Sequence, residues 1–134
     1  MAGIMSDTDK PQPGMILWHD LTVENAEAVR DFYAGVVGWR PSPVPMNGYD
    51  DFNMSVGEGG EAVAGICHAR GPNAEIPPQW MTYVIVENVD QSAARCRELG
   101  GTVVVGPKGM GSHGRYCVIR DPAGAVLALF TPAE

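Results

Sequence analysis

The sequence of 134 residues has few of the features that predict disulfide cross-links or a membrane anchor. Its three cysteines, Cys67, Cys96 and Cys117, are odd in number and have no CxxC spacing, a pattern typical of reduced, buried thiols. No apolar run approaches the roughly 18 residues that a membrane helix needs. Residues 1–14 also lack the continuous apolar core of a secretory signal. We therefore predict a cytoplasmic protein without membrane contact.

Positive charge is scarce as well. Nine Lys and Arg residues stand against 16 Asp and Glu, a formal net charge of −7. Because phosphate binding depends on clusters of Lys and Arg, we expect no nucleic-acid partner. The glycine-rich stretches GEGGEAVAG and GPKGMGSHG lack the spacing of a nucleotide-binding loop, and no GxSxG motif occurs. The acidic balance favours a cationic or neutral ligand.

A β-hairpin is predicted for the segment from Gly114 to Pro132, GRYCVIRDPAGAVLALFTP. Its centre, DPAG at 121–124, supplies a turn-starting carboxylate, a proline with a fixed φ and a permissive glycine. The run AVLALF is typical of a strand that is buried on both faces. We expect this hairpin to close a core.

The first half of the chain predicts a βαβββ module. Residues 15–23 favour a strand and 25–38 a helix, whereas the prolines of 41–48 indicate a loop or an edge. Two further strands are expected at 49–56 and 61–67. The buried face of the helix is predicted, from spacings of three and four, to hold Ala26, Val29, Phe32 and Val36.

After loop residues 70–78 the same order begins again. A strand is predicted at 80–86, a helix from Val89 that ends at Gly100-Gly101, and a strand at 102–105. The glycine-rich stretch GPKGMGSHG is expected to be a loop that leads into the hairpin. The apolar face of this second helix should hold Val89, Ala93, Cys96 and Leu99.

A constant offset of 63 positions maps one half onto the other, for example Gly38 onto Gly101. It also maps Val23-Glu24-Asn25 onto Val86-Glu87-Asn88, so we predict a duplication. The expected organisation is a flexible arm at 1–14 and a single α+β domain at 15–134. That domain consists of module one at 15–69, a linker at 70–78 and module two at 79–132.

These residues carry a family resemblance. Two βαβββ modules, the FYAGVVGW helix end, and ELGG followed by GRYCVIRDPAGAVLALF resemble the vicinal oxygen chelate superfamily. This superfamily includes glyoxalase I, bleomycin-resistance proteins and extradiol dioxygenases. The resemblance, which covers Met15 to Phe130, implies an open, cup-shaped mixed sheet with helices outside and a ligand cleft inside. It also implies a homodimer.

The resemblance further allows a test for the metal that many members carry. In those members a His on each first strand and a Glu on each last strand point into the cup. Here the matching positions hold Trp18, Gly65, Met81 and Ala128. None of these side chains suits a hard divalent cation. We therefore expect neither a metal at the usual chelate site nor another cofactor.

The histidines give weak evidence for a replacement metal site. Strand alternation places His19 on the face of Leu17 and Leu21, which predicts a structural, hydrogen-bonded histidine. His68 ends a strand and is expected to be solvated. His113 lies in the GMGSHGR loop. Two interpretations are open for it: it contacts a ligand or acts as an acid or base, or it is an ordinary surface residue.

Strand alternation also predicts which side chains face the cup, opposite the helices. The cup should combine aromatic walls with a few polar groups, as small-molecule pockets do. Its expected ligand-binding residues are Trp18, Asp20, Asn53, Ser55, Met81, Tyr83 and Tyr116, with Val118 inward and Trp80 at the rim. The aromatic side chains also have a plainer interpretation, in which they only fill the cup.

Asp20 is the residue singled out for chemistry. A carboxylate among aromatic side chains is partly desolvated, so its pKa should tend upward. It could serve as a general base or pair with a cationic ligand, or it could be an ordinary hydrogen-bonded strand residue. The first functional hypothesis is a metal-free protein that binds a small aromatic or cationic molecule. The alternative is a lyase, isomerase or dioxygenase that uses Asp20, Tyr83 or His113, with or without a rearranged metal site, and a third option is a non-catalytic scaffold.

Overall fold

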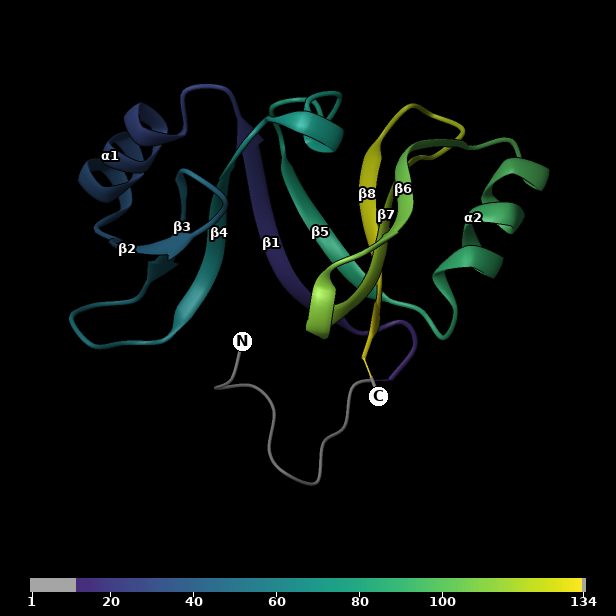
Figure 1. Cartoon of the computed structure of the whole chain (residues 1–134), viewed down its shortest axis with the longest axis horizontal. Coiled ribbons are helices and arrows are strands. Elements are labelled where there is room, and N and C mark those ends of the chain that lie inside the picture. The colour runs from purple at the N-terminus through teal and green to yellow at the C-terminus, as the bar shows by residue number, and fades with distance from the viewer. Residues whose placement is uncertain (1–11, 134) are drawn as a thin grey trace. The chain divides into compact units, whose positions relative to one another are not determined.

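The computed structural model describes residues 12–133, which form two compact units (Figure 1). Unit one comprises residues 18–80, and unit two comprises 12–17 together with 81–133. The arm predicted at 1–14 falls mostly outside the described residues. Of its described part, Gly14 donates its N–H to the carbonyl of Ile85 at 2.7 Å, which ties it to unit two.

Unit one has the predicted βαβββ order. Its elements are β1 (Ile16–Val23), α1 (Ala26–Val37), β2 (Arg40–Pro45), β3 (Asp50–Ser55) and β4 (Ala62–His68), followed by a 3-10 turn at Gly71–Asn73. The strands lie in the order β2-β3-β4-β1, with β1 and β4 parallel and the other pairs antiparallel. The proline-broken stretch is therefore an edge strand.

Unit two repeats this arrangement. Its elements are β5 (Trp80–Ile85), α2 (Val89–Glu98), β6 (Thr102–Gly109), a 3-10 turn at Gly111–His113, β7 (Gly114–Arg120) and β8 (Val126–Pro132). The strand order is β5-β8-β7-β6, and β5 and β8 are the parallel pair. The α+β class and the duplicated βαβββ order are thus confirmed.

The core of unit one lies between α1 and one face of its sheet. Its buried residues are Leu21, Val23, Ala26, Phe52, Met54 and Ile66. The predicted helix face was partly wrong, because Phe32 and Val36 are 57% and 66% exposed. Tyr33 packs against the core instead, together with Val29. The helical period explains this: Ala26, Val29 and Tyr33 share one face, and Phe32 is turned away from it.

The core of unit two is built in the same way from Val89, Ala93, Cys117 and Leu129. Leu99, which was expected on the buried face of the helix, is 63% exposed. The reason is that α2 ends at Glu98 and Leu99 is its C-cap residue. The glycine-rich stretch was also misjudged, since β6 continues through it to Gly109 and only residues after Gly109 leave the strand.

The predicted hairpin is confirmed, with β7 paired antiparallel to β8. The Asp121 carboxylate accepts hydrogen bonds from the N–H groups of Ala123 and Ala125 at 2.8 and 3.0 Å. Gly124 has a φ of +92°, a left-handed conformation that glycine adopts without strain. The turn therefore sets the register that brings Val118 opposite Ala128.

Candidate functional site

Each sheet has one face that its helix does not cover, and we call this the helix-free face. In unit one, Leu21 and Ile66 point towards α1, so their strand neighbours point the other way. Asp20 and Asn53 both pair in register with Gly65, from the two sides of β4. On the helix-free face of unit one, Asp20, Asn53 and Trp18 therefore lie around Gly65, which has no side chain.

Asp20 is held by its neighbours on this face. The indole Nε1–H of Trp18 donates to Asp20 Oδ1 in a short hydrogen bond. An added Cβ at Gly65 would collide with this Oδ1 atom and would come within 3.4 Å of the Trp18 Nε1. The carboxylate thus occupies the space that a side chain at position 65 would fill.

The thiol of Cys67, a half-buried residue, is another neighbour of Asp20. Its Sγ lies 3.9 Å from Asp20 Oδ2, so the thiol is directed at the second carboxylate oxygen. Burial, assisted by the negative charges of Asp20 and Asp51, raises the pKa of the Cys67 thiol well above its ordinary value. The thiol therefore stays protonated and acts as a hydrogen-bond donor to Asp20.

His68 was expected to be solvated, and this was wrong. Its side chain is only 10% exposed, and its two ring nitrogens contact two carboxylates. Nε2 lies 3.0 Å from Glu27 Oε2 in α1, and Nδ1 lies 3.1 Å from Asp51 Oδ1 in β3. Burial lowers the pKa of His68, but the hydrogen bonds and charges of Glu27 and Asp51 outweigh it, so that the pKa is raised.

The outcome for His19 is the reverse. This residue was predicted to be a structural histidine on the helix side of β1, but it is exposed. Its neighbours Leu17 and Leu21 are buried, at 9% and 6% exposure. Alternation along a strand predicts the face of the sheet on which a side chain such as His19 lies. It does not predict whether a helix extends far enough to cover that side chain, which explains why His19 is exposed.

The helix-free face of unit two has an equivalent pair, in which Tyr83 is the register partner of Ala128. This is the pairing of Asp20 with Gly65, displaced by 63 positions. The surroundings differ, since Met81, Val118 and Ala128 are completely buried and Tyr116 is 6% exposed. Lys108 lies over the Tyr116 ring, with Nζ 6.0 Å from its centroid.

The remaining predicted site residues lie in other surroundings. Trp80 packs with the core of unit one, where its Nε1–H donates to the Tyr33 hydroxyl at 3.1 Å. His113 is exposed and ends the 3-10 turn before β7. Ser55 is half-buried at the end of β3, next to a register shift in the pairing with β4. Within unit one, the structure brings together Trp18, Asp20 and Asn53.

Sequence reasoning did not include Asp51 and Cys67 in the site. Asp51 is 8% exposed and accepts a hydrogen bond from the His68 N–H at 2.9 Å. Alternation from Asn53 would have placed Asp51 on the helix-free face, so a usable signal was present. The partner of Cys67 could be found only from the parallel register of β1 and β4, in which Thr22 pairs with Cys67 two positions after Asp20.

The metal positions implied by the resemblance were tested against these side chains. Trp18 offers only an N–H that is donated to Asp20, and Gly65 and Ala128 offer no ligand atom. Met81 has a soft thioether and is completely buried. These residues do not fit a chelated hard cation. Among residues 12–133, no group of three or more His, Cys, Asp or Glu side chains is placed to hold a metal ion.

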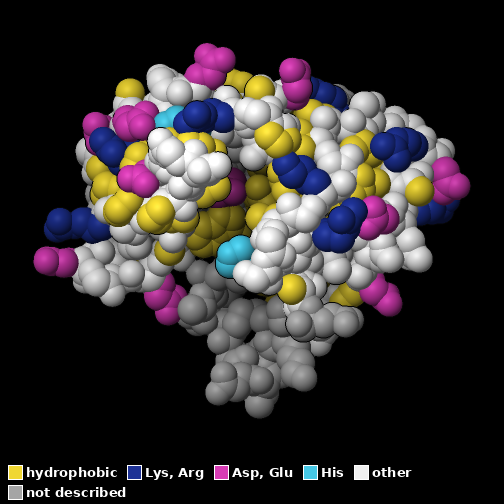
Figure 2. Space-filling view, viewed as in Figure 1, with side chains coloured by type: hydrophobic (Ala, Val, Ile, Leu, Met, Phe, Trp, Pro, Cys, Tyr) yellow, Lys and Arg dark blue, Asp and Glu magenta, His cyan; other side chains and the backbone are white. Residues whose placement is uncertain are grey.

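Charge is dispersed over one face of the molecule. On the face shown in Figure 2, the Lys and Arg side chains stand apart from one another and alternate with acidic ones. Several of the basic residues are engaged locally, such as Arg115, which forms a two-point ion pair with Asp90 at 2.9 and 3.1 Å. In the described part of the chain, neither helix is long and apolar enough to cross a membrane.

Comparison with solved structures finds the same fold in methylmalonyl-CoA epimerases. The enzyme from Mycobacterium tuberculosis is 17% identical, with a TM-score of 0.56, over 100% of this chain and 97% of that chain. An epimerase in complex with methylmalonyl-CoA and NH4+ is also 17% identical, with a TM-score of 0.57, over 91% and 96% of the two chains. At this identity the likeness concerns the fold alone.

Sequence relatives are more similar. The glyoxylase-like protein CFP32 of Mycobacterium tuberculosis is 30% identical over 122 residues, which are 91% of this chain and 46% of that protein. The anthracycline biosynthesis protein DnrV of Streptomyces peucetius is 29% identical over 133 residues, 88% of this chain and 47% of that protein. This chain thus spans about half the length of these relatives.

A family-level match covers most of the chain. The sequence pattern of the Glyoxalase/Bleomycin resistance protein/Dioxygenase superfamily matches residues 15–129. This range includes both βαβββ units almost completely and agrees with the fold of the epimerases. The chain therefore belongs to the Glyoxalase/Bleomycin resistance protein/Dioxygenase superfamily.

Proposed function

We propose that this protein binds a small aromatic or cationic molecule through its helix-free faces, without a metal at the usual chelate positions. The observation that carries the proposal is the Asp20 carboxylate held over Gly65 by the Trp18 indole. An ionised carboxylate beside an aromatic surface attracts cations and flat aromatic rings that bear a hydrogen-bond donor. The name of the Streptomyces peucetius relative, an anthracycline biosynthesis protein, agrees with a small-molecule ligand.

In this proposal different residues supply the charged, hydrogen-bonding and apolar contacts to the ligand. Trp18 and Asp20 supply the aromatic surface and the charge, while Asn53 and Ser55 supply hydrogen bonds from the neighbouring strand. On unit two, Tyr83, Tyr116 and Met81 supply apolar surface, and Trp80, the last residue of unit one, is the proposed rim residue. Because Met81 and Tyr116 are buried in the free protein, their contribution requires side-chain movement on binding.

A thermal-shift screen of amines and aromatic compounds tests the proposal. Since a ligand that binds only the native state raises the melting temperature, compounds of these classes should raise it for the wild type. The shift should fall strongly in Asp20→Asn, which keeps the shape and removes the charge. Asp50→Asn is the matched control, because Asp50 is exposed at the start of β3. Equal shifts in both variants would refute the role of Asp20.

Catalysis is the second candidate function. It is favoured by the contacts of Asp20, because hydrogen bonds from Trp18 and Cys67 to the two carboxylate oxygens fix the orientation of a group that could act as a general base. In this alternative Asp20 removes a proton from the substrate, and Tyr83 and His113 are the further acid–base groups. Unchanged turnover in Asp20→Asn, Tyr83→Phe or His113→Ala would remove that residue from the mechanism.

We also propose that the protein is a homodimer, as the family resemblance implies, and that it is cytoplasmic. Sedimentation equilibrium of the purified chain tests the dimer, with a mass of twice 14.3 kDa expected. A mass of 14.3 kDa at all concentrations would contradict it. Localisation of a tagged chain in the source cell tests the compartment.

A further inference from the structure

Five titratable side chains of unit one form a connected line from α1 to the candidate site. They are Glu27, His68, Asp51, Cys67 and Asp20. The Glu27 side chain is 59% exposed at the outer end of this line, whereas that of His68 is 10% exposed. His68 and Cys67 are consecutive residues of β4, so their side chains leave the strand on opposite faces. The line therefore passes from the helix side of the sheet to the helix-free face.

Asp51 connects the two halves of this line. It is 8% exposed, and its Oδ1 atom accepts the His68 backbone N–H at 2.9 Å and lies 3.1 Å from His68 Nδ1. The antiparallel register of β3 with β4 places it beside Cys67. Burial raises the pKa of the Cys67 thiol, and both Asp20 and Asp51 raise it further by charge and by hydrogen bonding. The thiol thus has two neighbouring carboxylates.

The two carboxylates compete for the thiol, because a thiol has only one proton to donate. In the structure the Cys67 Sγ atom lies 3.9 Å from Asp20 Oδ2, while Asp20 Oδ1 accepts the Trp18 indole N–H. A protonated His68 makes Asp51 the weaker competitor, since the imidazolium already donates a charge-assisted hydrogen bond to that carboxylate. Loss of the proton from His68 therefore makes Asp51 the stronger acceptor.

Other charged or titratable groups also surround His68. Besides its two carboxylate partners, they are Arg30 of α1, Tyr49 before β3 and Arg70 after β4. The Tyr49 and His68 ring centroids lie 5.2 Å apart, and the Arg70 Cζ atom lies 3.9 Å from the Tyr49 centroid. Histidine is the side-chain type that changes charge between about pH 5 and 8. The group of this cluster that responds to pH in that range is therefore His68.

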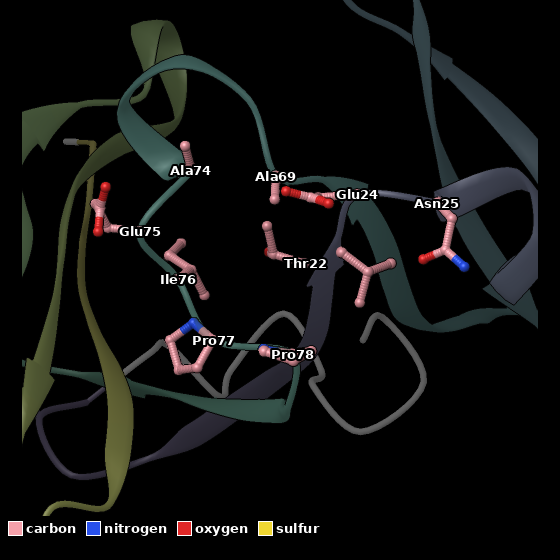
Figure 3. A pocket seen from close by; sticks show the side chains of 10 residues that line it. Thr22, Glu24, Asn25, Ala69, Ala74, Glu75, Ile76, Pro77 and Pro78 are labelled. Carbon is pink, nitrogen blue, oxygen red and sulfur yellow. The ribbon is translucent and has the colours of Figure 1, made fainter.

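Two further carboxylates lie near the end of β1 but outside the line. Glu24 and Glu75 border a pocket of about 430 Å³, and Figure 3 shows Glu24 beside the end of β1 and Glu75 on the linker, pointing away from the pocket. Among residues 12–133, no hydrogen bond or ion pair joins either of them to His68. Glu24 is therefore a control for Glu27, because both are exposed and only Glu27 contacts His68.

We propose that His68 and Asp51 are positioning residues for the Asp20 carboxylate. They act through the Cys67 thiol, which donates to Asp20 Oδ2 while His68 is protonated. When His68 loses its proton, the thiol turns to Asp51, and a donor of the ligand takes its place at Oδ2. The affinity for a cation therefore rises with pH. This last step rests on the function proposed for Asp20, whereas the coupling between His68 and Asp20 needs no ligand.

NMR of the 13C-labelled full chain tests the coupling in the absence of ligand. From about pH 5.5 to about pH 9, the Asp20 13Cγ signal should show an inflection at the midpoint of the His68 ring titration. Glu27→Gln should move both midpoints to lower pH by about half a unit, since it removes a carboxylate that holds the proton on His68. Glu24→Gln should leave both in place. A flat Asp20 signal, or equal midpoints in the two glutamine variants, would overturn the inference.

Two substitutions of Cys67 distinguish the thiol from a general field effect. Cys67→Ala removes the donor and should abolish most of the Asp20 inflection, while the His68 ring still titrates. Cys67→Ser, which keeps one proton to donate, should restore the inflection. An inflection of wild-type size in Cys67→Ala would overturn the role of the thiol.

n-Butylammonium, which stays charged over this pH range, tests the consequence for binding. Its dissociation constant, measured from amide shifts, should be about threefold lower at about pH 8.5 than at about pH 6, since one nearby, partly screened positive charge is lost. In His68→Gln the two constants should be equal. Equal constants in the wild type would overturn the pH dependence. Absence of binding at both pH values would refute the cation site at Asp20, and the 13Cγ titration would still decide the coupling.

Discussion

The Asp20 carboxylate on β1 occupies the space above Gly65, its register partner on β4. At the position on the last strand of unit one where members of the family carry a Glu, this chain has Gly65, and the carboxylate beside it comes from Asp20 on the first strand. The same register position in unit two holds Tyr83 beside Ala128. The duplicated backbone therefore presents a charged group on one unit and a phenol on the other.

Gly65→Ala should destabilise the fold and weaken ligand binding. The added methyl group would displace Asp20 Oδ1 and press on the Trp18 Nε1, an overpacking that typically costs about 1–3 kcal/mol. Urea unfolding measures the loss in free energy of unfolding. Gly109→Ala is the control, because a Cβ there meets nothing within 4 Å, and it should change stability by less than about 0.5 kcal/mol. Equal effects of both variants would contradict the packing argument.

The interaction of His68 with Glu27 and Asp51 should make stability depend on pH. Because the folded-state pKa of His68 is raised, its contribution is fully present below the unfolded pKa of about 6.5 and is lost as pH rises through the folded pKa. Urea unfolding from about pH 6 to about pH 9 should therefore show a stability difference between wild type and His68→Gln that shrinks with pH. A difference that grows over this range would show the opposite sign of the shift.

Cys67 and Cys117 should resist alkylation in the folded protein. Burial raises the pKa of the Cys67 thiol and raises that of Cys117 to about 11, and the thiolate is the reactive form. Iodoacetamide labelling at about pH 8, followed by mass spectrometry of the peptides, should modify both thiols only after unfolding in urea. Labelling of native Cys67 at the rate of a free thiol would show that it is accessible and ionised.

Two asparagines at equivalent positions should contribute differently to helix stability. Asn88 accepts a hydrogen bond from the Gln91 N–H at 3.0 Å at the start of α2, whereas Asn25 makes no side-chain capping bond to α1. Asn88→Ala should lower the free energy of unfolding by about 1 kcal/mol, and Asn25→Ala by clearly less. Thermal or urea unfolding of the two variants gives the comparison. An equal loss in both would show that the capping bond contributes nothing.

The fold could be predicted because its signals are local. Alternation along strands, glycines at helix ends and the turn at DPAG each depend on a few neighbouring residues, and the repeat supplied a second copy of the strand and helix pattern. The errors concern side chains whose burial is decided by tertiary packing. Phe32 and Tyr33 are both apolar enough for a core, and only the direction of α1 over the sheet selects Tyr33.

The candidate site was predicted in part for a similar reason. Asp20 and Trp18 follow from alternation on one strand, and the structure places them in contact. The partners Cys67 and Asp51 depend on which strands are adjacent and in which register. The same dependence explains His68, whose two carboxylate partners lie 41 and 17 residues away in the sequence. No pattern within a single strand indicates which other strand lies next to it.

The most direct test of the central claim is the thermal-shift screen in the presence and absence of EDTA, run on wild type and Asp20→Asn with metal analysis of the same samples. Amines or aromatic compounds should raise the melting temperature of the wild type equally with and without chelator, and the shift should fall in Asp20→Asn. Ligand shifts that vanish with EDTA, in a protein that carries one equivalent of transition metal, would contradict the account.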